Sequence, residues 1–209
     1  MAKIKNMING ITGADEEAYK KREQFIFLQK MAQTKCAEFK ADLENKILED
    51  KNKIEIGEGG FVQYYSAQYA DIHLCANEFI DEAVDSFFRG PECLKDDFKK
   101  LISGALEDLI NDTTIGEKQE DMFFIYPEYY AVIKLDVKVY KYNLSGNEMV
   151  ADCENVFCYT VAESIIDPAK LKLNELLYLV SDMSGAEKNI EVVKSFIHEI
   201  SSIWAKLEK

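Results

Sequence analysis

A change in the spacing of apolar side chains constrains the fold of this sequence more than any other feature. Over residues 133–139 apolar and polar side chains alternate, and a period of two is typical of a half-buried strand. The segments before and after this region repeat apolar side chains every three or four residues, as amphipathic helices do. Strands and helices do not alternate one by one, so we expect an α+β fold rather than a parallel α/β sheet.

The predicted order is N-terminal helices, a small antiparallel sheet over about residues 122–163, and two C-terminal helices. Residues 1–14 are expected to form a flexible arm and residues 15–209 a single α+β domain, because no internal repeat divides them. Helices are predicted over about residues 15–53, 64–88 and 92–110, and again after Asp167 and after Ser184. Strands are predicted at residues 122–126, 133–139 and 150–161.

The helix over residues 64–88 rests on an apolar stripe that includes Tyr65, Tyr69 and Phe79, and Gly90-Pro91 ends it. Its acidic residues are also at helical spacing, with Glu78 and Glu82 one turn apart and Asp81 and Asp85 one turn apart. Such pairs suit a hard cation, but a solvated acidic face explains them as well. We therefore predict no metal site.

Composition excludes some classes of protein. The 209 residues carry 38 acidic and 25 basic side chains, a formal net charge of −13. A duplex nucleic-acid binder needs a basic surface, so no nucleic-acid partner is expected. The five cysteines are odd in number and form no CxxC motif, and together with the lack of a secretory signal near Met1 they predict reduced thiols and a cytoplasmic location.

Motifs for common chemistry are missing from the sequence. It holds no phosphate-binding GxxxxGK[ST], no GxGxxG, no HExxH and no GxSxG. The two histidines are His73 and His198. Cys75 is two residues after His73, and side chains two residues apart on one helix point in different directions, so His73 and Cys75 cannot form a catalytic pair by themselves. We predict no cofactor and no catalytic residue, although an enzyme with a carboxylate or cysteine site remains an alternative.

Tyrosines give the remaining signal, because they concentrate in the predicted strands. Alternation places Tyr130, Tyr140 and Tyr142 on the polar face of the sheet together with Lys134. Exposed tyrosines often mark a recognition surface, and the last helix adds Trp204 on a wide apolar stripe. The predicted interface is Tyr130, Lys134, Tyr140, Tyr142 and Trp204. The alternative is that helices cover this face and the tyrosines belong to the core.

These observations favour a non-enzymatic acidic protein that binds a second copy of itself or another protein. A membrane-acting protein, whose helices would peel away to let amphipathic segments bind lipid, is an alternative. The negative charge disfavours contact with anionic lipids, and no apolar run reaches the length needed to span a bilayer.

Overall fold

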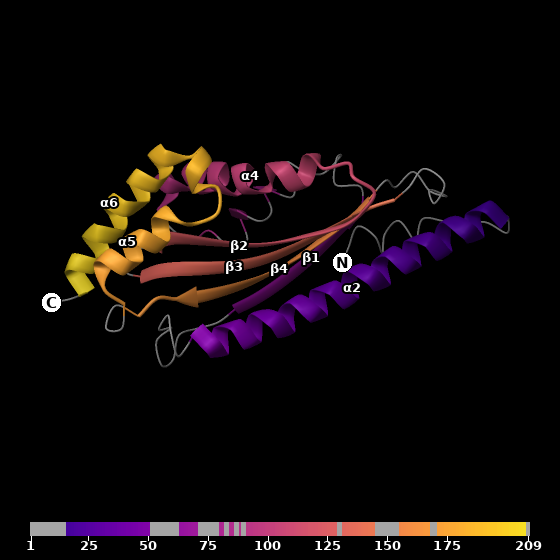
Figure 1. Ribbon diagram of the computed structural model, residues 1–209, viewed down its shortest axis with the longest axis horizontal. Coiled ribbons are helices and arrows are strands. Elements are labelled where there is room, and N and C mark those ends of the chain that lie inside the picture. Colours follow the sequence, from indigo (N-terminus) through magenta and orange to yellow (C-terminus); the bar gives the residue numbers. More distant parts are fainter. Residues whose placement is uncertain are drawn as a thin grey trace.

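A four-stranded antiparallel sheet with helices on both faces is formed by the residues described in this computed structural model (Figure 1). These are residues 16–50, 63–70, 80–81, 84–85, 88, 91–128, 131–144, 155–167 and 171–207. The helices are α2 (Glu16–Asp50), α4 (Lys95–Asn111), α5 (Leu173–Ser181) and α6 (Ile190–Leu207), with short 3-10 turns η1 (Glu92–Leu94) and η2 (Ala186–Lys188). The strands are β1 (Gln63–Ala70), β2 (Gly116–Glu128), β3 (Ala131–Asn143) and β4 (Asn155–Ile165). The predicted α+β fold is confirmed.

The strands lie in the order β1-β4-β3-β2, so β4 and β3 are central and β1 and β2 are the edges. The register places Tyr140 opposite Cys158 in the β3–β4 pair and Ser66 opposite Thr160 in the β1–β4 pair. Side chains of equal parity in β3 and β4 therefore share a face. Even-numbered residues of these strands face α2, and odd-numbered residues face the side of α4 and α6.

One prediction about the elements is wrong. Residues 63–70, most of which fall within the helix predicted over 64–88, form strand β1. Tyrosines at helical spacing suggest a helix stripe, but aromatic residues also favour strands, and pairing along β4 decides the outcome. Further along, residues 80–81 and 84–85 are helical, and the predicted arm at residues 1–14 lies outside the described residues.

The main hydrophobic core lies between the sheet and the helices α4, α5 and α6. Aromatic rings form its centre, with the ring centroid of Phe98 5.0 Å from those of both Phe88 and Tyr126. A second, smaller cluster lies on the opposite face, under α2. The central strand β4 is thus buried on both faces, because every residue from Asn155 to Ser164 is buried.

A buried lysine closes the end of α4. Lys141 of β3 is 1% exposed, and its Nζ donates hydrogen bonds to the carbonyl oxygens of Ile110 at 2.8 Å and Asp112 at 2.7 Å. The last carbonyls of a helix lack partners within the helix and carry partial negative charge. Lys141 supplies both the hydrogen bonds and the positive charge, so it joins the end of α4 to the sheet.

A left-handed glycine lets the α5–α6 connection approach α4. Gly185 has φ of +77°, and a Cβ atom there would lie 2.6 Å from the carbonyl oxygen of Leu101. Gly116 at the start of β2 also has a positive φ, +106°, but no atom lies within 4 Å of the corresponding position.

Replacement of Lys141 by methionine should lower the free energy of unfolding by about 1–3 kcal/mol, because buried carbonyls at the end of α4 lose their donor. The measurement is urea unfolding followed by circular dichroism. Lys194→Met is the control, since Lys194 is exposed and forms an ion pair with Glu191 of its own helix; it should cost less than about 0.5 kcal/mol. Equal losses for the two variants would contradict the role given to Lys141.

The two glycines form a second matched pair. Gly116→Ala should lower the free energy of unfolding by about 1–2 kcal/mol, the cost of a left-handed backbone alone. Gly185→Ala should cost about 1–3 kcal/mol more, because its new methyl group meets the backbone of α4. A thermal or urea unfolding curve of each variant measures the difference, and no difference would mean that the connection moves freely away from α4.

Candidate functional site

Three residues of the predicted interface are buried inside the chain. Tyr140 is 2% exposed, Lys134 5% and Trp204 0%. The expectation that they form an exposed docking surface is therefore wrong. Tyr142 is half-buried, and Tyr130 lies outside the described residues.

Trp204 belongs to the main core, and α2 covers the face that carries Lys134 and Tyr140 (Figure 1). Helix α2 lies mainly along β4, with further contacts to β1 and β3. The β4 side chains beneath it are small, which lets the helix lie close to the sheet: Cys158, Thr160, Ala162 and Ser164. Its apolar contribution comes from the stripe Phe25, Leu28, Ala32, Cys36 and Phe39.

Tyr140 is the buried tyrosine of the cluster under α2. Its hydroxyl lies 3.5 Å from the sulfur of Met31 and 3.5 Å from Oε2 of Glu117, and the Lys35 ammonium lies 5.3 Å from its ring centroid. Burial, with a smaller contribution from the negative charge of Glu117, raises the pKa of Tyr140. This tyrosine therefore remains a neutral phenol and contributes to packing.

Further along α2, the contact with the sheet becomes ionic. Asp136 of β3 is 1% exposed and accepts hydrogen bonds from Nζ of Lys134 at 2.8 Å and from Nζ of Lys46 at 2.8 Å. Lys134 comes from the same strand, whereas Lys46 reaches down from α2. A buried carboxylate needs such partners, because an unpaired charge in the interior is costly.

Lys138, two residues beyond Asp136 on β3, makes a second set of ionic contacts. Its Nζ lies 2.8 Å from Asp121 of β2 and 3.4 Å from Asp42 of α2. Burial lowers the pKa of Lys138, but the hydrogen bonds and charges of Asp121 and Asp42 outweigh burial, and the net shift is upward. We call Asp42, Lys46, Lys134, Asp136, Lys138 and Asp121 the ionic seam.

The seam explains why the polar face predicted for β3 is covered. Alternating Lys and Asp residues on a strand indicate a solvated face when the strand is considered alone. A signal for the cover was present in α2, where Asp42 and Lys46 follow Phe39 at the spacing of one helix face. The charges of Asp42 and Lys46 complement those of β3, and this complementarity between two separate segments cannot be detected from the spacing within β3 alone.

Two cysteines lie at the apolar end of the same contact. Cys36 of α2 and Cys158 of β4 are 7% and 0% exposed, and the neighbouring thiol of Cys36, together with burial, raises the pKa of Cys158. Cys93 is exposed, and Cys75 and Cys153 lie outside the described residues.

The two edges of the sheet differ sharply. On the outer side of β2, the backbone N–H of Phe123 donates to Oγ of Ser184 and its carbonyl oxygen accepts from the N–H of Ser184, both at 3.0 Å. Pro127 has the same parity as Phe123, so the position where its N–H is missing also faces outward. At the other edge, within the described residues, β1 pairs with β4 and with no second strand.

The chemistry of β1 also sets it apart. Its sequence QYYSAQYA carries three tyrosines and no charged residue, whereas β2 begins with charged side chains at Glu117, Lys118, Glu120 and Asp121. Charges and proline are the usual protection of a sheet edge. Ser66, in the middle of β1, is exposed.

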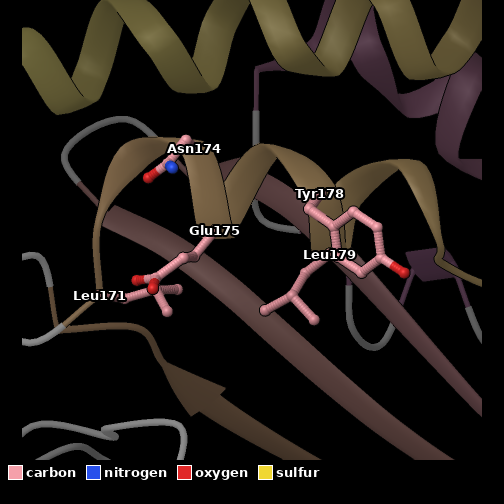
Figure 2. A pocket seen from close by; sticks show the side chains of 5 residues that line it. All are labelled: Leu171, Asn174, Glu175, Tyr178 and Leu179. Carbon is pink, nitrogen blue, oxygen red and sulfur yellow. The ribbon is translucent and has the colours of Figure 1, made fainter.

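A shallow hollow of about 470 Å³ lies on α5 (Figure 2). Its lining is Leu171, Asn174, Glu175, Tyr178 and Leu179. The carboxylate of Glu175 already accepts a hydrogen bond of 3.0 Å from the backbone N–H of Lys172, where it caps the helix. The hollow therefore offers mainly an apolar wall beside an exposed tyrosine.

Of the four acidic residues at helical spacing before Gly90, Asp81 and Asp85 are described. They form ion pairs with α4, Asp81 with Lys99 and Asp85 with Lys95 at 2.8 Å. His198 is exposed on α6, while His73 lies outside the described residues. Over the described part of the chain, no group of three or more His, Cys, Asp or Glu side chains could hold a metal ion, and no helix combines the length and apolar character needed to cross a membrane.

The ionic seam makes a quantitative prediction. Asp136→Asn should lower the free energy of unfolding by about 3 kcal/mol, because the buried ion pairs of Asp136 with Lys134 and Lys46 lose their carboxylate. Asp42→Asn removes a carboxylate that is 48% exposed and should cost less than about 1 kcal/mol.

The double variant Asp136→Asn with Lys134→Met should recover part of the loss, because the buried ammonium group that Asp136 neutralised is removed with it. Urea unfolding at neutral pH compares the unaltered chain, the two single variants and the double variant in one cycle. Additive effects of the two substitutions would show that the pair is not coupled.

No protein-family model matches this sequence, and no curated protein or solved structure matches it either. A function for the chain has to be inferred from its own contacts, burial and charges.

Proposed function

We propose that this chain is a non-enzymatic protein that assembles with a second copy of itself through the outer edge of β1. The observation that carries the proposal is the contrast between the two edges: β2 is closed by Ser184 and Pro127, and β1 is uncharged and, among the described residues, paired on one side only. The interface proposed here is therefore the tyrosine-containing edge strand β1, whereas the sequence had placed it on the sheet face that α2 covers.

An open edge strand favours pairing for a simple reason. Alternate backbone N–H and C=O groups of the strand point away from the sheet, and a second extended strand can satisfy them in a regular ladder. β1 has eight residues, longer than the short edges that proteins use to avoid such pairing. Tyrosine also has a high preference for strands.

Charge favours β1 as the place of contact between two copies. Each copy carries a formal net charge of −13, so approach is opposed over most of the surface. A strand free of charged residues is a place where two copies can meet without burying a like-charged pair.

The proposed contact has a twofold axis perpendicular to the sheet, so residues of equal parity lie opposite each other. With Ala67 on the axis, Tyr65 lies opposite Tyr69 of the second copy, and this happens twice. The two sheets would join into one of eight strands.

The contact is short, and small interfaces are usually weak. We therefore expect a dimer that forms as concentration rises. In light scattering coupled to size-exclusion chromatography, the mass should increase from 23.9 kDa towards twice that value across the micromolar range. A constant monomer mass over this range would remove the proposal.

Ser66→Lys tests where the copies meet. Whether Ser66 or Ala67 lies on the axis, the two new lysines are opposite or diagonal neighbours, and like charges at such positions oppose pairing. The dimer dissociation constant should rise about tenfold, equivalent to 1.4 kcal/mol.

Two controls belong to this experiment. Ser66→Ala removes the 2.9 Å hydrogen bond between the hydroxyls of Ser66 and Thr160 without adding charge, and should leave the dissociation constant nearly unchanged. Gln119→Lys adds the same charge at an exposed position of β2. If Gln119→Lys weakened the dimer as much as Ser66→Lys, the contact would lie elsewhere.

The membrane-acting alternative has less support from the geometry. Removing α2 would uncover Lys134, Asp136 and Lys138 beside Tyr140, and charged side chains are poorly suited to contact with lipid chains. Release of this helix would therefore uncover a surface on which charged and apolar side chains are mixed.

A further inference from the structure

Two cysteines far apart in the sequence meet in the contact between α2 and β4. Cys36 and Cys158 belong to the same small hydrophobic cluster, and the thiol of Cys36 is a close neighbour that helps to raise the pKa of Cys158. The proposed pairing of β1 plays no part in this contact, so the chemistry of the two thiols is independent of it.

The backbone around the pair fixes how the thiols approach. Sγ of Cys36 lies 3.8 Å from the carbonyl oxygen of Tyr159, the residue after Cys158. Oγ1 of Thr160 in turn donates to the carbonyl oxygen of Cys36 at 3.4 Å. Cys36 is thus held over residues 158–160 from both its side chain and its backbone.

The two thiols differ in accessibility. Cys158 is completely buried, and the neighbouring Cys36 thiol and burial keep it protonated by raising its pKa, opposed by the positive charge of Lys35. Cys36 retains 7% of its surface. Of the two thiols, Cys36 is therefore the one that a small reagent would reach first.

We propose that Cys36 and Cys158 form a modification site at which a small neutral disulfide oxidises the two thiols to an intramolecular disulfide. The Cys36 thiolate attacks one sulfur of the reagent, forms a mixed disulfide and releases one thiol. The Cys158 sulfur then attacks Sγ of Cys36 as its proton passes to the departing sulfur, and the second half of the reagent leaves as a thiol. The protein loses two hydrogen atoms and two electrons, and the reagent gains them.

The bond would fasten α2 covalently to a central strand. In the reduced chain α2 is held by a short apolar stripe and the ionic seam. A cross-link that closes more than a hundred residues of chain removes many conformations of the unfolded state. The oxidised protein should therefore resist detachment of α2 and unfold at a higher temperature.

The test incubates the full-length chain with bis(2-hydroxyethyl) disulfide at mildly alkaline pH and maps the acid-quenched peptides by mass spectrometry. A neutral reagent avoids repulsion by the acidic protein. The expected product is a peptide pair linked through Cys36 and Cys158 and lighter than the two reduced peptides by two hydrogen atoms, while exposed Cys93 carries a mercaptoethanol adduct. A stable adduct on Cys36 with a free Cys158 thiol would overturn the proposal, as would two unmodified thiols after Cys93 has reacted completely.

Variants provide the controls. Cys93→Ser should leave the linked pair unchanged, and Cys36→Ser should abolish it and leave Cys158 unmodified. Oxidised Cys93→Ser should unfold roughly 5–10 °C above its reduced form, and a reducing agent should reverse the shift. An unchanged unfolding temperature despite a complete cross-link would contradict the expectation that the disulfide holds α2 on the sheet. The peptide map of the unaltered chain needs no substitution, so it stands even if Cys36→Ser fails to fold.

Discussion

The cover that α2 provides over the two central strands is the contact on which the rest of the structure depends. β3 and β4 carry buried side chains on both faces, and those on the α2 face include a carboxylate and two ammonium groups. Without α2, Asp136 would lose Lys46, and Tyr140 and Cys158 would lose their apolar neighbours. A mixed surface of this kind is stable only under a partner that matches both its charged end and its apolar end.

The two faces of the sheet carry packing regions of different character, one under α2 and the other under α4, α5 and α6. The main core under α4, α5 and α6 is large and rich in aromatic rings, and the buried Lys141 on that side serves the end of a helix. The region under α2 is smaller and combines small side chains with ion pairs. Since ion pairs add directional constraints, this region fixes where along the sheet α2 lies rather than contributing most of the stability.

Much of the fold could be predicted from spacing along the chain. The long first helix, the helix before β2, the β3–β4 hairpin and the final helix each have a clear period that the structure confirms. Strand β1 could not be predicted in this way, because its tyrosines at positions 65 and 69 satisfy helical spacing as well as a strand. Only its pairing with β4, about ninety residues later, distinguishes the two. The prediction of an exposed tyrosine face was wrong for a related reason: whether a polar strand face is wet depends on another segment, here Asp42 and Lys46 of α2.

The charged residues of β3 also limit the ways in which the sheet can misalign. A slip of β3 by one residue would turn every side chain to the opposite face. Lys141 would then leave the carbonyls at the end of α4 and point towards α2, and Asp136 would turn away from Lys46 into the aromatic core. Both errors bury an unpaired charge at once, whereas a strand with only aliphatic residues would lose little. The charges of Lys141 and Asp136 therefore oppose a one-residue slip of β3.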